Sequence, residues 1–187
     1  MEVEVRAEAK DKRINRMVAI SVVILSVFTG ICNIKDGNIV QAMEQAQADA
    51  VDAWSQYQAT RTKLHLAQDS RAMLAAVTQG TPSPIARTAI VRLNGEIARY
   101  QAETPGLARK AKAYRQHYDA LNIHDDQFDA SEALIAIAIS LAAVAALCEI
   151  MGLLFASWAF GALGLFMSLC GFAGWSFHPA MLSNFLG

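Results

Sequence analysis

Two long stretches of the sequence lack charge, and this absence excludes an ordinary soluble fold. Residues 17–34 contain no Asp, Glu, Lys or Arg, and residues 133–187 contain one, Glu149. Apolar residues make up 54% of the chain and are concentrated in these blocks. A bilayer core of about 30 Å needs roughly 20 apolar helical residues, so the first block can cross once and the second twice.

Cysteine is scarce, and catalytic motifs are missing. Cys32, Cys148 and Cys170 lie in or beside apolar blocks, so we expect no disulfide framework. The sequence has no Gly-rich phosphate loop, G-x-S-x-G elbow or H-E-x-x-H motif. We expect no enzyme activity, no catalytic residue and no cofactor.

Two histidines share a helix face but do not make a metal site by themselves. His117 and His124 are seven residues apart, whereas a metal needs three or four converging ligands. We expect solvated side chains and no metal ligand; the alternative is a site shared between subunits. The net charge of -1 lacks the basic excess that a nucleic-acid partner requires.

The first apolar block is longer than the core of a cleavable signal peptide. It leads into Ile31-Cys32-Asn33-Ile34-Lys35, which lacks a small-residue cleavage site. We therefore interpret it as a retained transmembrane helix rather than a leader.

Charges beside the predicted spans indicate an orientation. The basic residues before the first span are Arg6, Lys10, Lys12, Arg13 and Arg16. The acidic residues before the second are Asp125, Asp126, Asp129 and Glu132. Because basic residues favour the cytoplasmic side, we expect a cytoplasmic N-terminus and an extracytoplasmic middle segment in the cell (inner) membrane.

The predicted fold is an all-α membrane protein with three transmembrane helices and a long antiparallel, coiled-coil-like helical hairpin between the first and second spans. The predicted segments are a cytoplasmic segment (1–16), transmembrane helix 1 (17–35), the hairpin (36–131) with a turn at 79–84, transmembrane helix 2 (132–148), a turn (149–152), transmembrane helix 3 (153–176) and a C-terminal tail (177–187).

Apolar residues recur at steps of three and four through both arms of the predicted hairpin. One seam runs from Ile39 to Leu74 and the other from Ala86 to Phe128, with Thr104 and Asp125 as polar exceptions in the second. The seam residues with large side chains that we single out are Tyr57, Leu64, Ile97, Tyr100, Tyr114 and Tyr118. These stripes predict that the arms pack together.

Proline marks both the turn and an interruption. Ser83-Pro84 is typical of an N-cap followed by the first helical residue. Thr104-Pro105-Gly106 lies inside the second arm, where proline removes a backbone donor. We favour a kink or short break with both halves packed on the first arm over a separate third element.

Several apolar side chains do not fit the seams. Trp54, Leu66, Ile85 and Val91 lie off them, which suggests a second face for a neighbouring subunit or another protein. The alternative is that Trp54 simply flanks the intramolecular seam.

Small residues at helical spacing predict close helix contacts within the apolar blocks. They are Ala138, Ala142 and Ala146 in the second span and Gly161, Gly164 and Ser168 in the third. These contacts lie either within one chain or between chains.

Glu149 is expected in a wetted turn; the alternative is a buried carboxylate serving as a proton or cation site.

The residues also resemble a family. The stretch Asp52-Ala53-Trp54-Ser55-Gln56-Tyr57-Gln58-Ala59, the helix ending in His117 to Phe128, and Ile135-Ala136-Ile137-Ala138 leading into Ala142 to Leu147 resemble the bacterial membrane family catalogued as domain of unknown function 4337. Glu149 departs from the basic and aromatic residues expected after Leu147. The resemblance implies the membrane architecture described above, and the family name supplies no activity.

Two functions remain as hypotheses. In the first, the protein is a structural or accessory membrane protein that forms a homo-oligomer or scaffolds a larger membrane complex. In the second, subunits enclose a pore that conducts a small solute. The last two spans lack the polar rings of a wide aqueous pore, so we favour the first.

Overall fold

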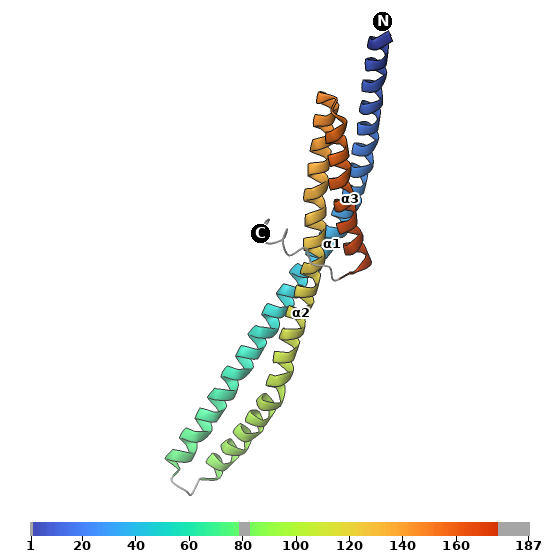
Figure 1. The fold of residues 1–187 in the computed structure, drawn as a ribbon. Coiled ribbons are helices and arrows are strands. Elements are labelled where there is room, and N and C mark those ends of the chain that lie inside the picture. The colour runs from blue at the N-terminus through green and yellow to red at the C-terminus, as the bar shows by residue number, and fades with distance from the viewer. Residues whose placement is uncertain (1, 79–82, 176–187) are drawn as a thin grey trace. The chain divides into compact units, whose positions relative to one another are not determined.

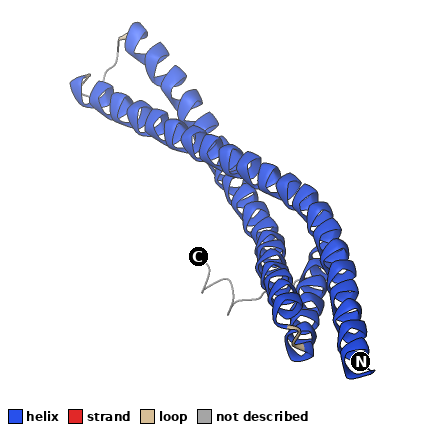
Figure 2. Ribbon diagram, turned by 90° about the horizontal axis from the view of Figure 1, so that it is seen from above, coloured by secondary structure: helices blue, strands red, loops and turns tan. Residues whose placement is uncertain are grey.

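Three α-helices make up almost all of the described chain in the computed structural model (Figure 1). The backbone is described for residues 2–78 and 83–175, and the side chains for 12–78 and 83–175. The helices are α1 (Glu2–Val77), α2 (Pro84–Cys148) and α3 (Met151–Ala173). These ranges contain no strand (Figure 2). The predicted tail and most of the predicted turn at 79–84 lie outside the described residues.

All three helices are long and apolar enough to cross a membrane. In each helix, no more than 33% of the most apolar stretch of 18 residues is buried inside the protein. Most of these apolar side chains therefore face outward, an arrangement that water disfavours. Length, composition and exposure together indicate a membrane protein.

The chain forms two compact units, and each is described by itself. The first combines residues 1–42 with 120–187, and the second comprises residues 43–119. In the first unit, the early part of α1, the late part of α2 and α3 lie side by side (Figure 1). One apolar cluster contains Ile14, Val18, Ala142, Ala145 and Leu154. A second contains Leu25, Ile135 and Ala138.

A two-residue connection joins α2 to α3. It consists of Glu149 and Ile150, so Met151 and Gly152 of the predicted turn belong to α3. Glu149 has a φ of 57°, in the left-handed region that L residues rarely adopt. Its side chain is exposed, which fits a wetted turn rather than a buried carboxylate.

Helix α3 ends in a hydrogen-bonded glycine cap. Gly174 has a φ of 68°, and the backbone N–H of Trp175 donates to the carbonyl of Cys170 at 3.0 Å. This is the Schellman arrangement, in which glycine takes the left-handed conformation without a steric cost.

Helix α2 is continuous through Pro105. The hydroxyl of Thr104 donates to the carbonyl of Tyr100 at 2.6 Å. The carbonyl that lacks its usual helical N–H donor because of Pro105 is that of Gln101. Because Pro84–Cys148 is helical throughout, the sequence forms neither a break nor a separate third element here.

In the second unit, residues 43–77 of α1 and 84–119 of α2 lie side by side (Figures 1 and 2). Ser83 caps α2 as expected, since its hydroxyl accepts the backbone N–H of Ala86 at 3.3 Å. Arg71 donates to Asn94 at 3.3 Å and links the two segments. The buried side chains of this unit are Met43, Ala46, Ala50, Ala53, Thr60, Ala67, Ala86, Ile97 and Ala111.

The left-handed conformation of Glu149 generates a prediction. Replacing it with glycine (Glu149→Gly) should stabilise the protein by about 1 kcal/mol, because glycine adopts positive φ without a Cβ clash. The thermal unfolding temperature of the detergent-solubilised protein should rise. Glu149→Ala removes the same charge but keeps the Cβ, so a similar rise in that variant would contradict the explanation.

Candidate functional site

Glycines allow α3 to contact the other helices of the first unit closely. A Cβ added at Gly164 would lie 2.7 Å from Cγ1 of Ile135, and one at Gly171 would lie 2.8 Å from the ring of Phe128. At Gly161 the nearest atoms would be the two Leu25 methyl carbons, each at 3.4 Å. Gly164 and Gly171 therefore accept a larger residue only if their neighbours move, whereas a Cβ at Gly161 would make ordinary van der Waals contact.

The six small residues singled out in the sequence all lie at contacts inside this chain. Ala138, Ala142 and Ser168 are fully buried, and Gly161 and Gly164 are buried beside them. Ala146 is partly buried against the cluster that contains Ala142. Their burial within the chain leaves little of them for another subunit.

A buried polar group joins the three helices. The thiol of Cys32 on α1 donates to the hydroxyl of Ser168 on α3 at 3.3 Å, and Ser168 also hydrogen-bonds Ser131 on α2. Nearby, the hydroxyl of Ser157 donates to the carbonyl of Ala138 at 2.7 Å. Buried hydroxyls with partners of this kind fix helix positions, because breaking the bonds leaves them unsatisfied.

The predicted seam residues of the second unit differ in burial. Ile97 is buried, whereas Tyr57, Leu64, Tyr100, Tyr114 and Tyr118 are partly buried. Trp54 is 38% exposed and its ring meets Tyr57 edge-on at 5.3 Å. Trp54 thus flanks the seam through Tyr57 and keeps part of its ring accessible.

Each tyrosine of the chain carries a basic side chain over its ring. The four pairs, with their distances to the ring centroid, are Arg61 with Tyr57 (5.8 Å), Arg99 with Tyr100 (4.8 Å), Lys110 with Tyr114 (5.7 Å) and Arg115 with Tyr118 (5.1 Å). Such cation–π contacts contribute about 0.5–1 kcal/mol each at exposed sites. Sequence reasoning missed them, although each cation lies within four positions of its tyrosine.

Carboxyl groups from two helices meet where the apolar part of α1 ends. Asp36 on α1 faces Asp125, Asp129 and Glu132 on α2. The Oδ1 atom of Asp36 is buried and has no N–H or O–H donor among the described residues. The carboxyl of Asp125 lies within hydrogen-bonding reach of Asp36 and donates only when it is protonated.

These surroundings favour the protonated form of Asp125. Its burial, followed by the nearby carboxylates of Asp129, Asp36 and Asp126, raises the pKa of Asp125 to about 6. Burial, together with neighbouring carboxylates, also raises the pKa of Asp36 and that of Asp129. The sequence places the α2 acids beside a span but does not reveal that Asp36 faces them.

A series of hydrogen bonds between polar groups joins the end of α3 to α2. The side-chain amide of buried Gln127 donates to the carbonyl of Trp175 at 2.8 Å, and Nδ1 of His124 lies 3.1 Å from the Gln127 carbonyl oxygen. His117 is exposed and does not take part in these hydrogen bonds. Within residues 12–78 and 83–175, no three His, Cys, Asp or Glu side chains are grouped to hold a metal ion.

One comparison with known proteins gave a match. The model of the family described as "Domain of unknown function (DUF4337)" matches residues 14–174. No curated protein and no solved structure matches the chain.

The carboxyl pair generates a pH-dependent prediction. Because the pKa of Asp125 is about 6 in the folded protein and 3.8 in an unperturbed Asp, this carboxyl contributes a stabilisation that is fully present only below about pH 4. Stability should fall as pH rises through 6, by about 1 kcal/mol after solvent screening. Asp125→Asn should remove most of this dependence, since an amide donates to Asp36 at every pH.

The measurement is thermal unfolding of the solubilised protein between pH 4 and pH 8. Asp69→Asn changes an exposed carboxylate outside the group and should retain the wild-type dependence. A wild-type protein whose stability rises steadily across this range would contradict the raised pKa of Asp125.

Proposed function

The chain belongs to the family of domain of unknown function 4337, and we propose that it is a non-enzymatic, multi-pass membrane protein that assembles with itself through one face of its helical hairpin. In this proposal, residues 17–35, 132–148 and 153–176 cross the bilayer. Residues 36–131 form the antiparallel, coiled-coil-like hairpin outside the cytoplasm.

Exposed apolar side chains support membrane insertion. Within residues 17–35 of α1, the large aliphatic residues that are more than half exposed are Ile20, Val23, Ile24, Val27, Ile31 and Ile34. Side chains of this kind are stable on an outer surface when hydrocarbon surrounds them. The basic residues that precede them, Arg13 and Arg16 included, favour the cytoplasmic orientation of the N-terminus.

The observation that carries self-assembly is an apolar stripe on the second unit. Leu66, Met73 and Val77 are 66%, 71% and 74% exposed. Their spacing of seven and four residues places them on one face of α1. This stripe lies in the part of α1 that the proposal puts in water, so a second copy that covers it would remove apolar surface from solvent.

The composition of the intramolecular seam explains why such a cover is needed. Six of the nine buried residues in this unit are alanine, and a single methyl group removes little apolar area from water. Two long helices joined by so narrow a seam are marginally stable alone. Covering the Leu66–Met73–Val77 stripe adds larger apolar side chains to the buried area.

Self-assembly predicts that the detergent-solubilised protein has a mass above that of one 20.2 kDa chain. Replacing the stripe (Leu66→Ser, Met73→Ser and Val77→Ser together) should shift the protein toward the monomer by tenfold or more, because three large side chains leave the interface. Light scattering coupled to size exclusion measures this change.

The control is Val51→Ser, which removes an exposed aliphatic side chain of α1 outside the stripe. It should leave the mass unchanged. A monomeric wild-type protein at micromolar concentration, with no co-purifying partner, would overturn the proposal.

The orientation can be tested with a native thiol. Cys148 is exposed beside the α2–α3 connection, whereas Cys32 and Cys170 are buried. The proposed topology places Cys148 on the cytoplasmic side, so a membrane-impermeant maleimide should leave it unlabelled in intact cells and modify it after permeabilisation. Ala76→Cys, at an exposed position in the hairpin, should be labelled in intact cells. Labelling of Cys148 without permeabilisation would reverse the orientation.

A further inference from the structure

A groove between α1 and α3 lies within the apolar part of the first unit. Its volume is about 210 Å³. Its lining residues are Ser21, Ile24 and Leu25 from α1 and Trp158, Gly161, Ala162 and Leu165 from α3. The indole N–H of Trp158 donates to the hydroxyl of Ser21 at 2.8 Å, which satisfies both polar side chains.

The groove is small, open and apolar. Sites for compact small molecules have volumes of about 300–1,000 Å³ and present several polar groups, whereas this groove is smaller and its hydroxyl and indole are already bonded to each other. An extended hydrocarbon segment matches these properties better than a compact ligand. In the proposed bilayer such segments are supplied by lipid acyl chains.

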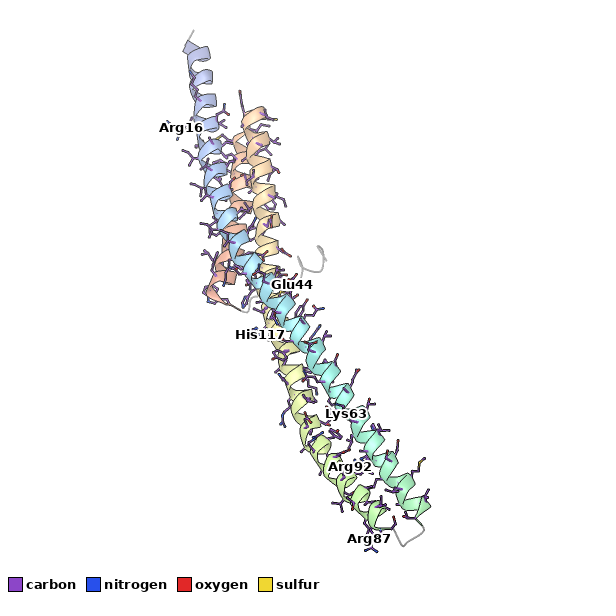
Figure 3. The ribbon with its side chains drawn as sticks, turned by 180° about the vertical axis from the view of Figure 1, so that it is seen from behind. Arg16, Glu44, Lys63, Arg87, Arg92 and His117 are labelled. Atoms are coloured by element: carbon purple, nitrogen blue, oxygen red, sulfur yellow. The ribbon has the colours of Figure 1, made fainter. Side chains whose placement is uncertain are left out.

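Basic residues of α1 lie between this groove and the N-terminus. Arg13 is exposed and precedes Ile24 by eleven residues, which is three helical turns along the same face and about 16 Å. Arg16 is also exposed but points away from α2 and α3 (Figure 3). Of these two arginines, Arg13 is the one placed to meet a headgroup whose acyl chain enters the groove.

We propose that the α1–α3 groove binds an anionic phospholipid of the cytoplasmic leaflet, with one acyl chain between Ile24 and Leu165 and the phosphate beside Arg13. This inference rests on the proposed membrane insertion and orientation. The cytoplasmic leaflet is rich in anionic lipids, and a basic residue near its surface contributes about 1 kcal/mol to their binding.

Native mass spectrometry of the full chain in detergent tests the site with phosphatidylglycerol and phosphatidylcholine of identical acyl chains. The wild-type protein should retain phosphatidylglycerol about fivefold more than phosphatidylcholine, the ratio expected from one basic contact. Arg13→Gln should abolish this preference, whereas Arg16→Gln should leave most of it. Equal retention of the two lipids by the wild-type protein would overturn the proposal.

A second pair of variants tests the acyl chain. Ala162 lines the groove and is exposed, so Ala162→Phe should fill it and lower phosphatidylglycerol retention about tenfold. Ala159→Phe adds the same ring at an exposed position of α3 that does not line the groove. Equal losses of phosphatidylglycerol retention in both variants would overturn the proposal. A smaller assembly in Ala162→Phe would also overturn it, because that result would mean that a second copy of the chain occupies the groove. Lipid binding in detergent does not depend on the orientation of the protein in a membrane. The lipid experiment and the maleimide experiment therefore test the groove and the proposed topology separately.

Discussion

The close approach of α3 to α2 depends on the absence of a Cβ at two positions. Gly164 brings the α3 backbone against Ile135, and Gly171 brings it against the ring of Phe128. Hydrocarbon provides little hydrophobic drive between helices, so van der Waals contact and hydrogen bonds must hold them. The bonds of Ser168 to Cys32 and Ser131 form only because the three helices come this near to one another.

The helices of the two units pack through different residue types. In the first, glycine and serine create close contacts that exclude other atoms from the helix interface. In the second, alanine fills the seam, and larger apolar side chains such as Leu66 and Met73 remain outside it. Among the described residues, the buried side-chain polar atoms of the first unit have partners within the chain except Oδ1 of Asp36, whereas much of the apolar surface of the second unit is not covered by the chain. This difference is why the proposed assembly contact lies on the second unit.

Much of the helical organisation could be predicted from local patterns. The uncharged block at 17–34 locates the apolar part of α1, and Ser83-Pro84 locates the start of α2. Glu149 correctly marks the region of the α2–α3 connection, although Met151 and Gly152 belong to α3 because two residues suffice to reverse the chain. Continuity through Pro105 was less predictable, because proline removes the N–H donor to the Gln101 carbonyl and is strongly unfavourable inside a helix.

The contacts between distant residues required the structure. Asp36 and Asp125 are separated by 89 positions, and heptad periodicity alone does not say which turn of α1 faces which turn of α2. The same limit applies to Cys32 and Ser168. By contrast, the cations over the tyrosine rings depend on neighbours within one helical turn, and a search for basic residues near each tyrosine would have found them.

The alanine seam of the second unit has a consequence for helix register. Ala46, Ala50 and Ala53 follow one another at one-turn spacing along the seam. Identical methyl groups fit in more than one alignment, so sliding one helix past the other by one turn would exchange alanine for alanine there. Shape alone therefore discriminates weakly between alignments. Selection of one alignment falls to the few distinctive contacts, among them Arg71 with Asn94 and the buried side chain of Ile97, and to the short connection between Val77 and Pro84.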